Sequence, residues 1–473
     1  MNDNISKDKK IECQENECKA CEECIVDEKT GGCSIKKRID YKGYIKRCLN
    51  NNIQLKFDLL VISHFFGRWI PFAIAVGLIT GSIAALMDVL IININKFLTT
   101  NIILILVYPL IVSILVGFLA SKDNSIAGAG IGYSVLHLKS KAYLKLKSLV
   151  YKFILAVFTL SGGFIAGREG PSFFLGVGIG EWVGKSYGLG KGYKNILGLI
   201  GGGAFTGALL KAPLGSSIFA MELENMYDFD YRPFAPMIVA SIISYLTFSF
   251  FRGTHPFILL TDKPEWTLMS IPYIIIMGLV ISLITYIYTF IFHFGIDVSK
   301  IISAVKRPIV GTLVAIPFLI GLYLVTQDID MLSAPAHMSI VSKLAQVPFP
   351  IYVDVAIIIF TLMITSLTIG FGIPGGLVLP NLIIGAATGN IFGHMFPDEM
   401  VMFTLAGMGS ALSAAAKTPL AAIVMITEMS HADVVIPMTA SVITSYITSF
   451  GFSLYLGQEN ALRPLLKRRA VKK

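Results

Sequence analysis

The sequence predicts an all-α, polytopic membrane protein assembled from two related halves. The first indication is composition: 54% of the 473 residues are hydrophobic, 15% are charged and the mean hydropathy is +0.71. These values exclude a soluble globular chain. The second is a series of long apolar stretches that fill most of the chain after residue 58. The third is a glycine- and proline-rich interruption that recurs in both halves.

The most informative stretch is Gly-Arg-Glu-Gly-Pro, residues 167–171, inside the apolar run 153–183. Burying a carboxylate at this depth of the membrane costs free energy, so Glu169 is expected to have a function. Flanking glycines free the backbone, and Pro171 suits the first turn of a new helix. We expect a break between two half-helices, with Glu169 at the positive end of the second, where free N–H groups bind anions. When no ion is bound, the Glu169 carboxylate can occupy the anion position at these N–H groups. The alternative is a loop with a snorkelling Glu169 beside Arg168.

The interruption returns in altered form as Gly-Phe-Gly-Ile-Pro-Gly-Gly-Leu-Val-Leu-Pro over residues 370–380. Further on, Lys-Thr-Pro-Leu leading to Glu428 repeats the earlier Lys-Ala-Pro-Leu leading to Glu222. The recurrence of both motifs in the same order predicts an internal repeat, with halves at residues 56–251 and 268–456. Interrupted apolar segments at matching positions are typical of a binding site near the membrane midplane. An odd number of crossings in each half would make the repeats inverted.

The remaining stretches predict ordinary spans and one further ion contact. Leu59–Leu98 is expected to form a long helix broken at Arg68 and Pro71, and residues 327–350 an irregular loop. Residues 124–133 contain three alternating glycines that free the backbone to wrap an ion with its amides; the alternative is a flexible loop.

Polar residues concentrate in two tails, 1–55 and 457–473, and the net charge is +9. Basic residues flank the apolar body at both ends, which predicts a cell-membrane protein with both termini in the cytoplasm. The same charge could serve nucleic-acid binding, but it flanks membrane segments and has no folded domain of its own, so no nucleic-acid partner is expected. The first tail holds all six cysteines, which suit a zinc or iron–sulfur site or remain free thiols: Cys13, Cys18, Cys21, Cys24, Cys33 and Cys48. No other cofactor is expected.

Gly-Arg-Glu-Gly-Pro followed by Ser172 resembles the signature of the CLC chloride channels and proton-coupled anion exchangers. The resemblance covers roughly residues 56–465 and includes the second-half motifs in the correct order. It implies two inverted repeats with broken and re-entrant helices, and a homodimer in membrane lipid with one ion path per subunit. It also implies transport of chloride or another small anion, coupled to protons through Glu169. The paired cytoplasmic domains of some family members are not expected.

The resemblance assigns roles residue by residue. Gating or proton transfer falls to Glu169, Glu222 and Glu224. Anion contacts fall to backbone groups at half-helix starts and to one tyrosine hydroxyl: Ala129, Gly130, Ile131, Arg168, Gly170, Leu377, Val378 and Tyr455.

Three departures from the family pattern affect these roles. Ala129 replaces the serine that contacts the central anion, and Val378 replaces a phenylalanine. The inner proton-accepting glutamate falls on Leu223, while Glu224 lies one residue further, about 100° around the helix. A chloride/proton antiporter is therefore the favoured function, with a passive chloride channel or a fluoride/proton antiporter as alternatives. An intramembrane enzyme is disfavoured because neither Gly-x-Ser-x-Gly nor His-Glu-x-x-His occurs.

Overall fold

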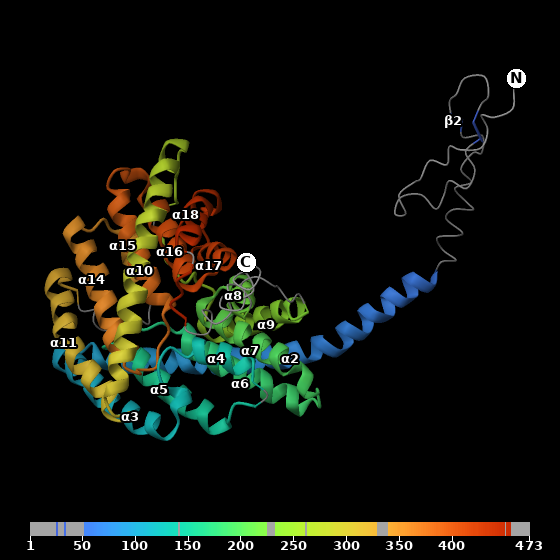
Figure 1. Ribbon diagram of the computed structural model, residues 1–473, viewed down its shortest axis with the longest axis horizontal. Coiled ribbons are helices and arrows are strands. Elements are labelled where there is room, and N and C mark those ends of the chain that lie inside the picture. The colour runs from blue at the N-terminus through green and yellow to red at the C-terminus, as the bar shows by residue number, and fades with distance from the viewer. Residues whose placement is uncertain are drawn as a thin grey trace, which may run out of the picture. The chain divides into compact units, whose positions relative to one another are not determined.

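The computed structural model describes residues 25–26, 33–34, 52–140, 142–224, 232–260, 263–328, 339–449 and 451–455. The chain divides into two compact units, Met1–Gly67 and Arg68–Lys473. In the first unit, β1 (Ile25–Val26) and β2 (Cys33–Ser34) form a short antiparallel ladder. The second unit is built from helices (Figure 1). Seven helical segments of the described chain are long and apolar enough to cross a membrane, which confirms the predicted all-α, multi-pass fold.

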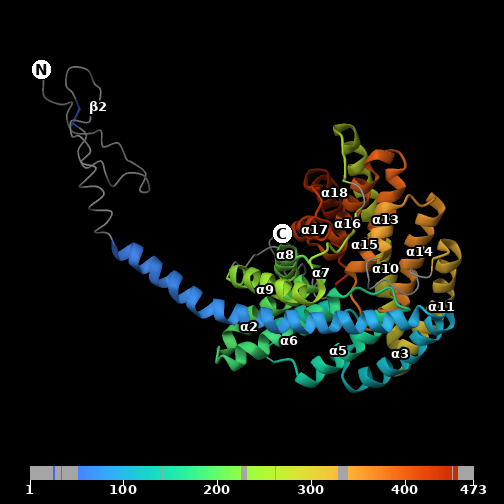
Figure 2. The ribbon, with the colours of Figure 1, turned by 180° about the vertical axis from the view of Figure 1, so that it is seen from behind.

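The helices of the first half follow one another in the order shown in Figures 1 and 2. They are α2 (Asn52–Leu98), α3 (Ile102–Lys122), α4 (Ile131–Leu138), α5 (Leu146–Ser161), α6 (Glu169–Ser186), α7 (Lys194–Leu210), α8 (Pro213–Glu224) and α9 (Phe234–Arg252).

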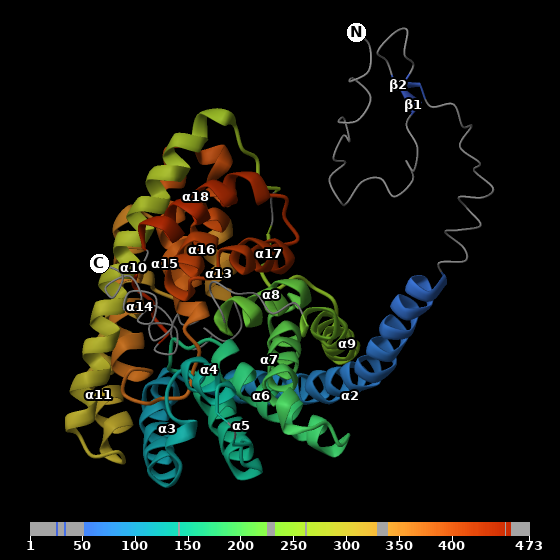
Figure 3. The ribbon, with the colours of Figure 1, turned by 45° about the vertical axis from the view of Figure 1, so that its right-hand side comes forward.

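The helices of the second half repeat this order of long and short elements. They are α10 (Ile271–Ile301), α11 (Lys306–Thr326), α13 (Ser339–Gln346), α14 (Ile351–Thr368), α15 (Val378–Gly393), α16 (Met400–Ala416), α17 (Pro419–Ser430) and α18 (Val435–Thr448). Figure 3 shows α7 beside α9 and α16 beside α18, two matching pairs that pack together.

Two pairs of equivalent helices have the same lengths, and one of these pairs ends in the same backbone conformation. α7 and α16 are both 17 residues long, and α8 and α17 are both 12. The residue that follows α7 is Lys211 with φ 53°, and the residue that follows α16 is Lys417 with φ 59°, so the chain passes through the left-handed region at the same point in both repeats. The predicted internal repeat is therefore confirmed in the folded chain.

The two glycine-rich breaks cross each other and show the relation between the halves. The N–H of Gly167 donates to the carbonyl of Gly376 at 2.9 Å, and the N–H of Gly376 donates back to Gly167 at 2.7 Å. This is an antiparallel bridge between equivalent segments, so the two segments run in opposite directions. Opposite directions of matching segments are what inverted repeats require.

Glycines let the half-helices approach closely within each repeat. A methyl group at Gly176 of α6 would collide with the backbone of Gly201 in α7, and the reverse is also true. The same reciprocal contact joins Gly385 of α15 to Gly407 of α16. Without a hydrophobic driving force between helices in lipid, such close backbone contact supplies much of the packing energy.

Two expectations for the elements were wrong. α2 is continuous through Pro71, because one lost backbone hydrogen bond is offset by packing around the buried rings of Trp69 and Phe72. Their rings make edge-on contacts with aromatic side chains after α6. The loop at 327–350 contains the helix α13, which is the eight-residue counterpart of α4 and is too short for a periodic sequence signal.

Candidate ion site

The starts of three helices meet where the glycine-rich breaks cross. α4 begins at Ile131, α6 at Glu169 and α15 at Val378. A methyl group on Gly376 would collide with the Glu169 carboxylate and lie 2.7 Å from the backbone nitrogen of Gly170. Helix starts carry unpaired N–H groups and partial positive charge. Their convergence therefore creates a site that favours an anion.

Glu169 places its carboxylate between two of these helix starts. The side chain is fully buried, and its Oε1 accepts a hydrogen bond of 2.5 Å from the backbone N–H of Val378. Its Oε2 has no hydrogen-bond partner among the described residues. The prediction that a half-helix begins at Glu169 is confirmed. A negatively charged group thus occupies the position that the surrounding amides would offer to an ion.

The glycine loop before α4 is held by a lysine that the sequence analysis did not select. Lys152 of α5 is fully buried and donates to the carbonyl oxygens of Ile126 at 2.9 Å and Gly128 at 3.0 Å. A methyl group on Gly130 would lie 3.3 Å from the ammonium group. The site therefore contains a buried amino group beside Ala129, where no side-chain hydroxyl is present. A lysine inside an apolar helix was the available signal.

Two buried tyrosines bring hydroxyl groups to the site. Tyr455 is 2% exposed, and the N–H of the preceding Leu454 donates to Ala415 at 3.0 Å, which fixes the segment against α16. Its hydroxyl lies within electrostatic range of the Glu169 carboxylate and of the Tyr288 hydroxyl. Neither hydroxyl has a hydrogen-bond partner in the described part of the chain. Both hydroxyls are therefore candidates for a contact with an ion.

Tyr288 was missed because its sequence context is ambiguous. α10 carries Tyr286 and Tyr288 two residues apart, and such a pair places one ring on each side of a helix. In the structure Tyr286 is 43% exposed and Tyr288 is fully buried. The sequence alone does not say which of them faces the protein interior.

Arg168 is the predicted anion contact whose side chain lies elsewhere. Its Nη1 binds Oδ1 of Asp88 in α2 at 2.6 Å, and Oδ2 of Asp88 accepts from Nε of Arg252 at 2.6 Å. The guanidinium charge is therefore neutralised by a buried partner. Arg168 fixes the glycine-rich break to α2, next to the Glu169 carboxylate.

Comparison with known proteins identifies the family to which this arrangement belongs. The profile of the voltage-gated chloride channel family matches residues 122–449, which include all three converging helix starts. The chain belongs to the CLC family.

Several CLC relatives are similar over most of their length. An uncharacterised protein of Methanocaldococcus jannaschii is 27% identical over 392 residues, covering 81% of this chain and 95% of the relative. The H⁺/Cl⁻ exchange transporter ClcA of Salmonella typhimurium is 26% identical over 350 residues, covering 68% and 69%.

Solved CLC structures share the fold. A CLC-type fluoride/proton antiporter superposes with a TM-score of 0.72 at 20% identity, covering 83% of this chain and 98% of that protein. A slow cyanobacterial Cl⁻/H⁺ antiporter gives a TM-score of 0.71 at 22% identity, covering 86% and 99%. The chain is therefore a membrane transport protein, and the intramembrane enzyme alternative is rejected on family membership.

The inner glutamates of this CLC chain have structural partners. The Glu222 carboxylate accepts hydrogen bonds from the N–H groups of Leu420 at 3.1 Å and Ala421 at 2.8 Å, at the start of α17. Leu223 is buried, and Glu224 is half-buried at the last residue of α8. Glu222 therefore caps the start of α17.

The second half of the chain contains the reciprocal cap. Glu428 of α17 accepts from the N–H groups of Leu214 at 3.1 Å and Gly215 at 2.7 Å, at the start of α8. This reciprocity explains why the two Pro-Leu-to-Glu motifs recur at the same spacing.

The predicted tail site lies outside the described residues, which include only the backbone of Cys33 in β2 among the six cysteines. Within the parts of the chain that the structure describes, no three His, Cys, Asp or Glu side chains are grouped to hold a metal ion.

Proposed function

We propose that the protein exchanges chloride for protons across the cell membrane and that Glu169 is the gate. The observation that carries this proposal is the hydrogen bond from the Val378 N–H to the Glu169 carboxylate at the junction of α6 and α15. The printed functions of two relatives support it, since one is an H⁺/Cl⁻ exchange transporter and another a Cl⁻/H⁺ antiporter.

The gate works by competition for the same amide donors. As a carboxylate, Glu169 occupies the helix starts and blocks the path of the anion. When an anion takes its place, the displaced carboxylate loses its hydrogen bond in a buried environment and takes up a proton instead. Anion entry and proton uptake then become linked at one side chain.

The anion is bound mainly by backbone N–H groups in this proposal. The donors are Gly130, Ile131, Gly170, Leu377 and Val378, together with the hydroxyl of Tyr455. Ala129 contributes no side-chain donor. Tyr288 supplies a second hydroxyl, which replaces the contact that the family's serine makes.

A passive chloride channel is the second candidate, and a specific observation favours it. Leu223 occupies the position of the inner glutamate and is buried, so it cannot relay a proton. Glu222 is held by two amides. An exchanger would therefore need Glu224, or water that reaches Glu169 directly. The Ala129 substitution keeps a fluoride/proton antiporter as a third candidate.

The test is proton uptake by liposomes that carry an outward chloride gradient. Uptake against a proton gradient is expected for the native protein. The variant Glu224→Gln assigns the relay: loss of uptake selects Glu224, and retained uptake selects the water route. Fast chloride flux without proton movement in the native protein would contradict the exchanger and select the channel. Uptake with fluoride but not chloride would select the third candidate.

Tyr288→Phe should weaken chloride binding by about tenfold or more, because a hydrogen bond to a charged partner contributes about 1.5–3 kcal/mol. Isothermal titration of chloride into the purified protein in detergent measures this change. The matched control is Tyr108→Phe, which removes a hydroxyl that already donates to the Phe158 carbonyl at 2.9 Å. Equal affinities in both variants would remove Tyr288 from the site.

The remaining sequence predictions complete the proposal. The protein is a homodimer in membrane lipid, with the membrane repeats at residues 56–251 and 268–456. Both termini, including the tails 1–55 and 457–473, lie in the cytoplasm. The cysteines of the first tail hold zinc or an iron–sulfur cluster, or remain free thiols.

A further inference from the structure

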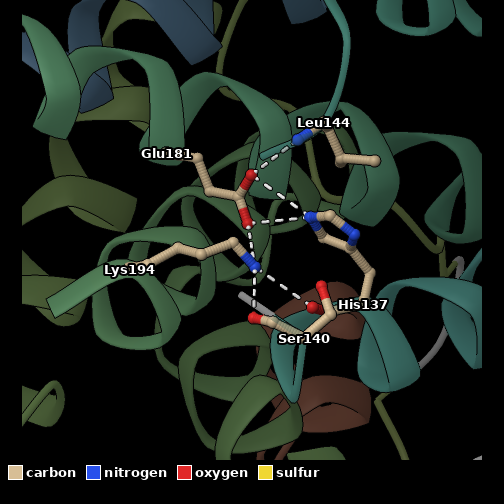
Figure 4. A network of polar contacts seen from close by, with 5 residues as sticks. All are labelled: His137, Ser140, Leu144, Glu181 and Lys194. Carbon is tan, nitrogen blue, oxygen red and sulfur yellow. Dashed lines mark hydrogen bonds and ion pairs between the residues drawn. The ribbon is translucent and has the colours of Figure 1, made fainter. Parts of the chain in front are cut away.

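A buried polar cluster at the far end of α4 is not used by the proposed transport cycle (Figure 4). It joins His137 of α4, Glu181 of α6 and Lys194 of α7, which are 8%, 1% and 2% exposed. Nε2 of His137 lies 3.1 Å from Oε1 of Glu181, and Nζ of Lys194 lies 3.0 Å from the same oxygen. The N–H of Leu144 donates to Oε2 at 3.0 Å. Charges this deep are retained only where they are paired, as they are here.

The cluster binds the C-terminal end of α4 through hydrogen bonds. Nζ of Lys194 donates to the carbonyl oxygens of His137 and Ser140, each at 3.1 Å. These are the carbonyls that a helix end leaves without an internal partner, and they carry its partial negative charge. Glu181 holds the same end through the His137 ring, and it holds the following segment through Leu144. Three helices are thus fixed to one another at this point.

The opposite end of α4 lies at the ion site. The helix has only eight residues, about 12 Å, so it has little stability of its own and its position depends on its contacts. A methyl group at Gly130, just before its start, would lie 2.8 Å from the carbonyl of Gly170 in α6. A shift of the C-terminal end of α4 therefore moves the N–H groups of Gly130 and Ile131 relative to the Glu169 gate.

Among the described residues of the second repeat, the equivalent positions of α15 and α16 do not form such an ion pair. Asn390 of α15 occupies the position that matches Glu181 of α6, counted from the helix starts, and it donates to the carbonyl of Val347 at 3.3 Å. Met400 opens α16 where Lys194 opens α7. The pseudo-symmetric fold is therefore complete without the ion pair. This difference argues that the charges serve the first repeat, whose short helix supplies N–H groups to the ion.

We propose that Glu181 and Lys194 are positioning residues that set the anion affinity of the site through α4. Lys194 donates to the carbonyls at the C-terminal end of α4 and so holds that end in place. The ion pair also fixes the helix axis against α6 and α7. The proposal rests on the proposed anion-transport function and adds two residues that touch neither anion nor gate.

Chloride affinity in Lys194→Met and Glu181→Gln tests the proposal. Titration calorimetry on the full-length protein in detergent should show chloride binding that is about tenfold weaker in both variants, because each loses contacts that position α4. Lys194→Arg keeps the positive charge and the donors, and should restore most of the affinity. Thermal unfolding of the same samples separates affinity from stability.

Glu428→Gln is the matched control, because Glu428 also binds helix N–H groups but lies outside the ion site. It should lower the unfolding temperature and leave chloride affinity unchanged. Lower unfolding temperatures with unchanged affinity in the Lys194 and Glu181 variants would overturn the positioning role and leave the proposed function intact. Absence of chloride, nitrate and fluoride binding by the native protein would overturn the proposed function, and the positioning role with it.

Discussion

Replacing Glu169 with glutamine should abolish proton movement while anion flow continues and loses its dependence on pH. The glutamine has the shape of the protonated acid and no charge, so it competes weakly for the Val378 N–H, to which the native carboxylate binds at 2.5 Å. It also cannot carry a proton. Parallel recordings of chloride efflux and external pH in liposomes measure both quantities, and proton uptake should fall to the level of empty vesicles.

The result is specific only if other buried glutamates behave differently. Glu428→Gln removes a carboxylate whose hydrogen bonds go to the start of α8 and not to the three converging helix starts, so the proton coupling of this variant should equal that of the native protein. Uphill proton movement in Glu169→Gln would show that another group carries the proton. Loss of anion flow together with proton flow, in a correctly folded variant, would show that the charge of Glu169 helps the anion to bind.

The sequence was sufficient to predict the repeat and the start of the helix at Glu169. Gly167 and Pro171 marked the break, Glu169 marked the helix start, and the Pro-Leu motifs marked the second pair of helices. These features are local, because glycine, proline and an intramembrane carboxylate each restrict the backbone or the charge at their own position.

The partners of these residues could not be predicted in the same way. Arg168 stands next to the gate in sequence, yet its guanidinium binds Asp88, which is 80 residues earlier. Tyr288 reaches the site from α10 only because that helix turns one of two nearby tyrosines inward. Glu222 is a proton-transfer candidate by resemblance, and the sequence did not indicate that its carboxylate caps a helix of the other repeat. Each of these contacts joins distant segments, so periodicity and motif spacing carry no information about them.

Asp88→Asn should destabilise the protein more than any other single change considered, by about 3–5 kcal/mol, the usual effect of removing one member of a buried ion pair. Asp88 is 5% exposed and neutralises two guanidinium groups at 2.6 Å each. Arg168, which is also buried, would lose its charge partner at the first residue before the gate helix. We expect a lower unfolding temperature in detergent, measured by scanning fluorimetry.

The exposed ion pair between Lys300 and Asp297 provides the control for this prediction. Its side chains are 63% and 70% exposed, so water and salt screen the interaction, and Asp297→Asn should leave the unfolding temperature unchanged. Adding Arg252→Gln to Asp88→Asn should recover part of the lost stability, because it removes one of the two unpaired cations. Equal unfolding temperatures for Asp88→Asn and the native protein would mean that Arg168 finds another partner. The glycine-rich break would then be held to the rest of the molecule by its bridge to Gly376 and not by α2.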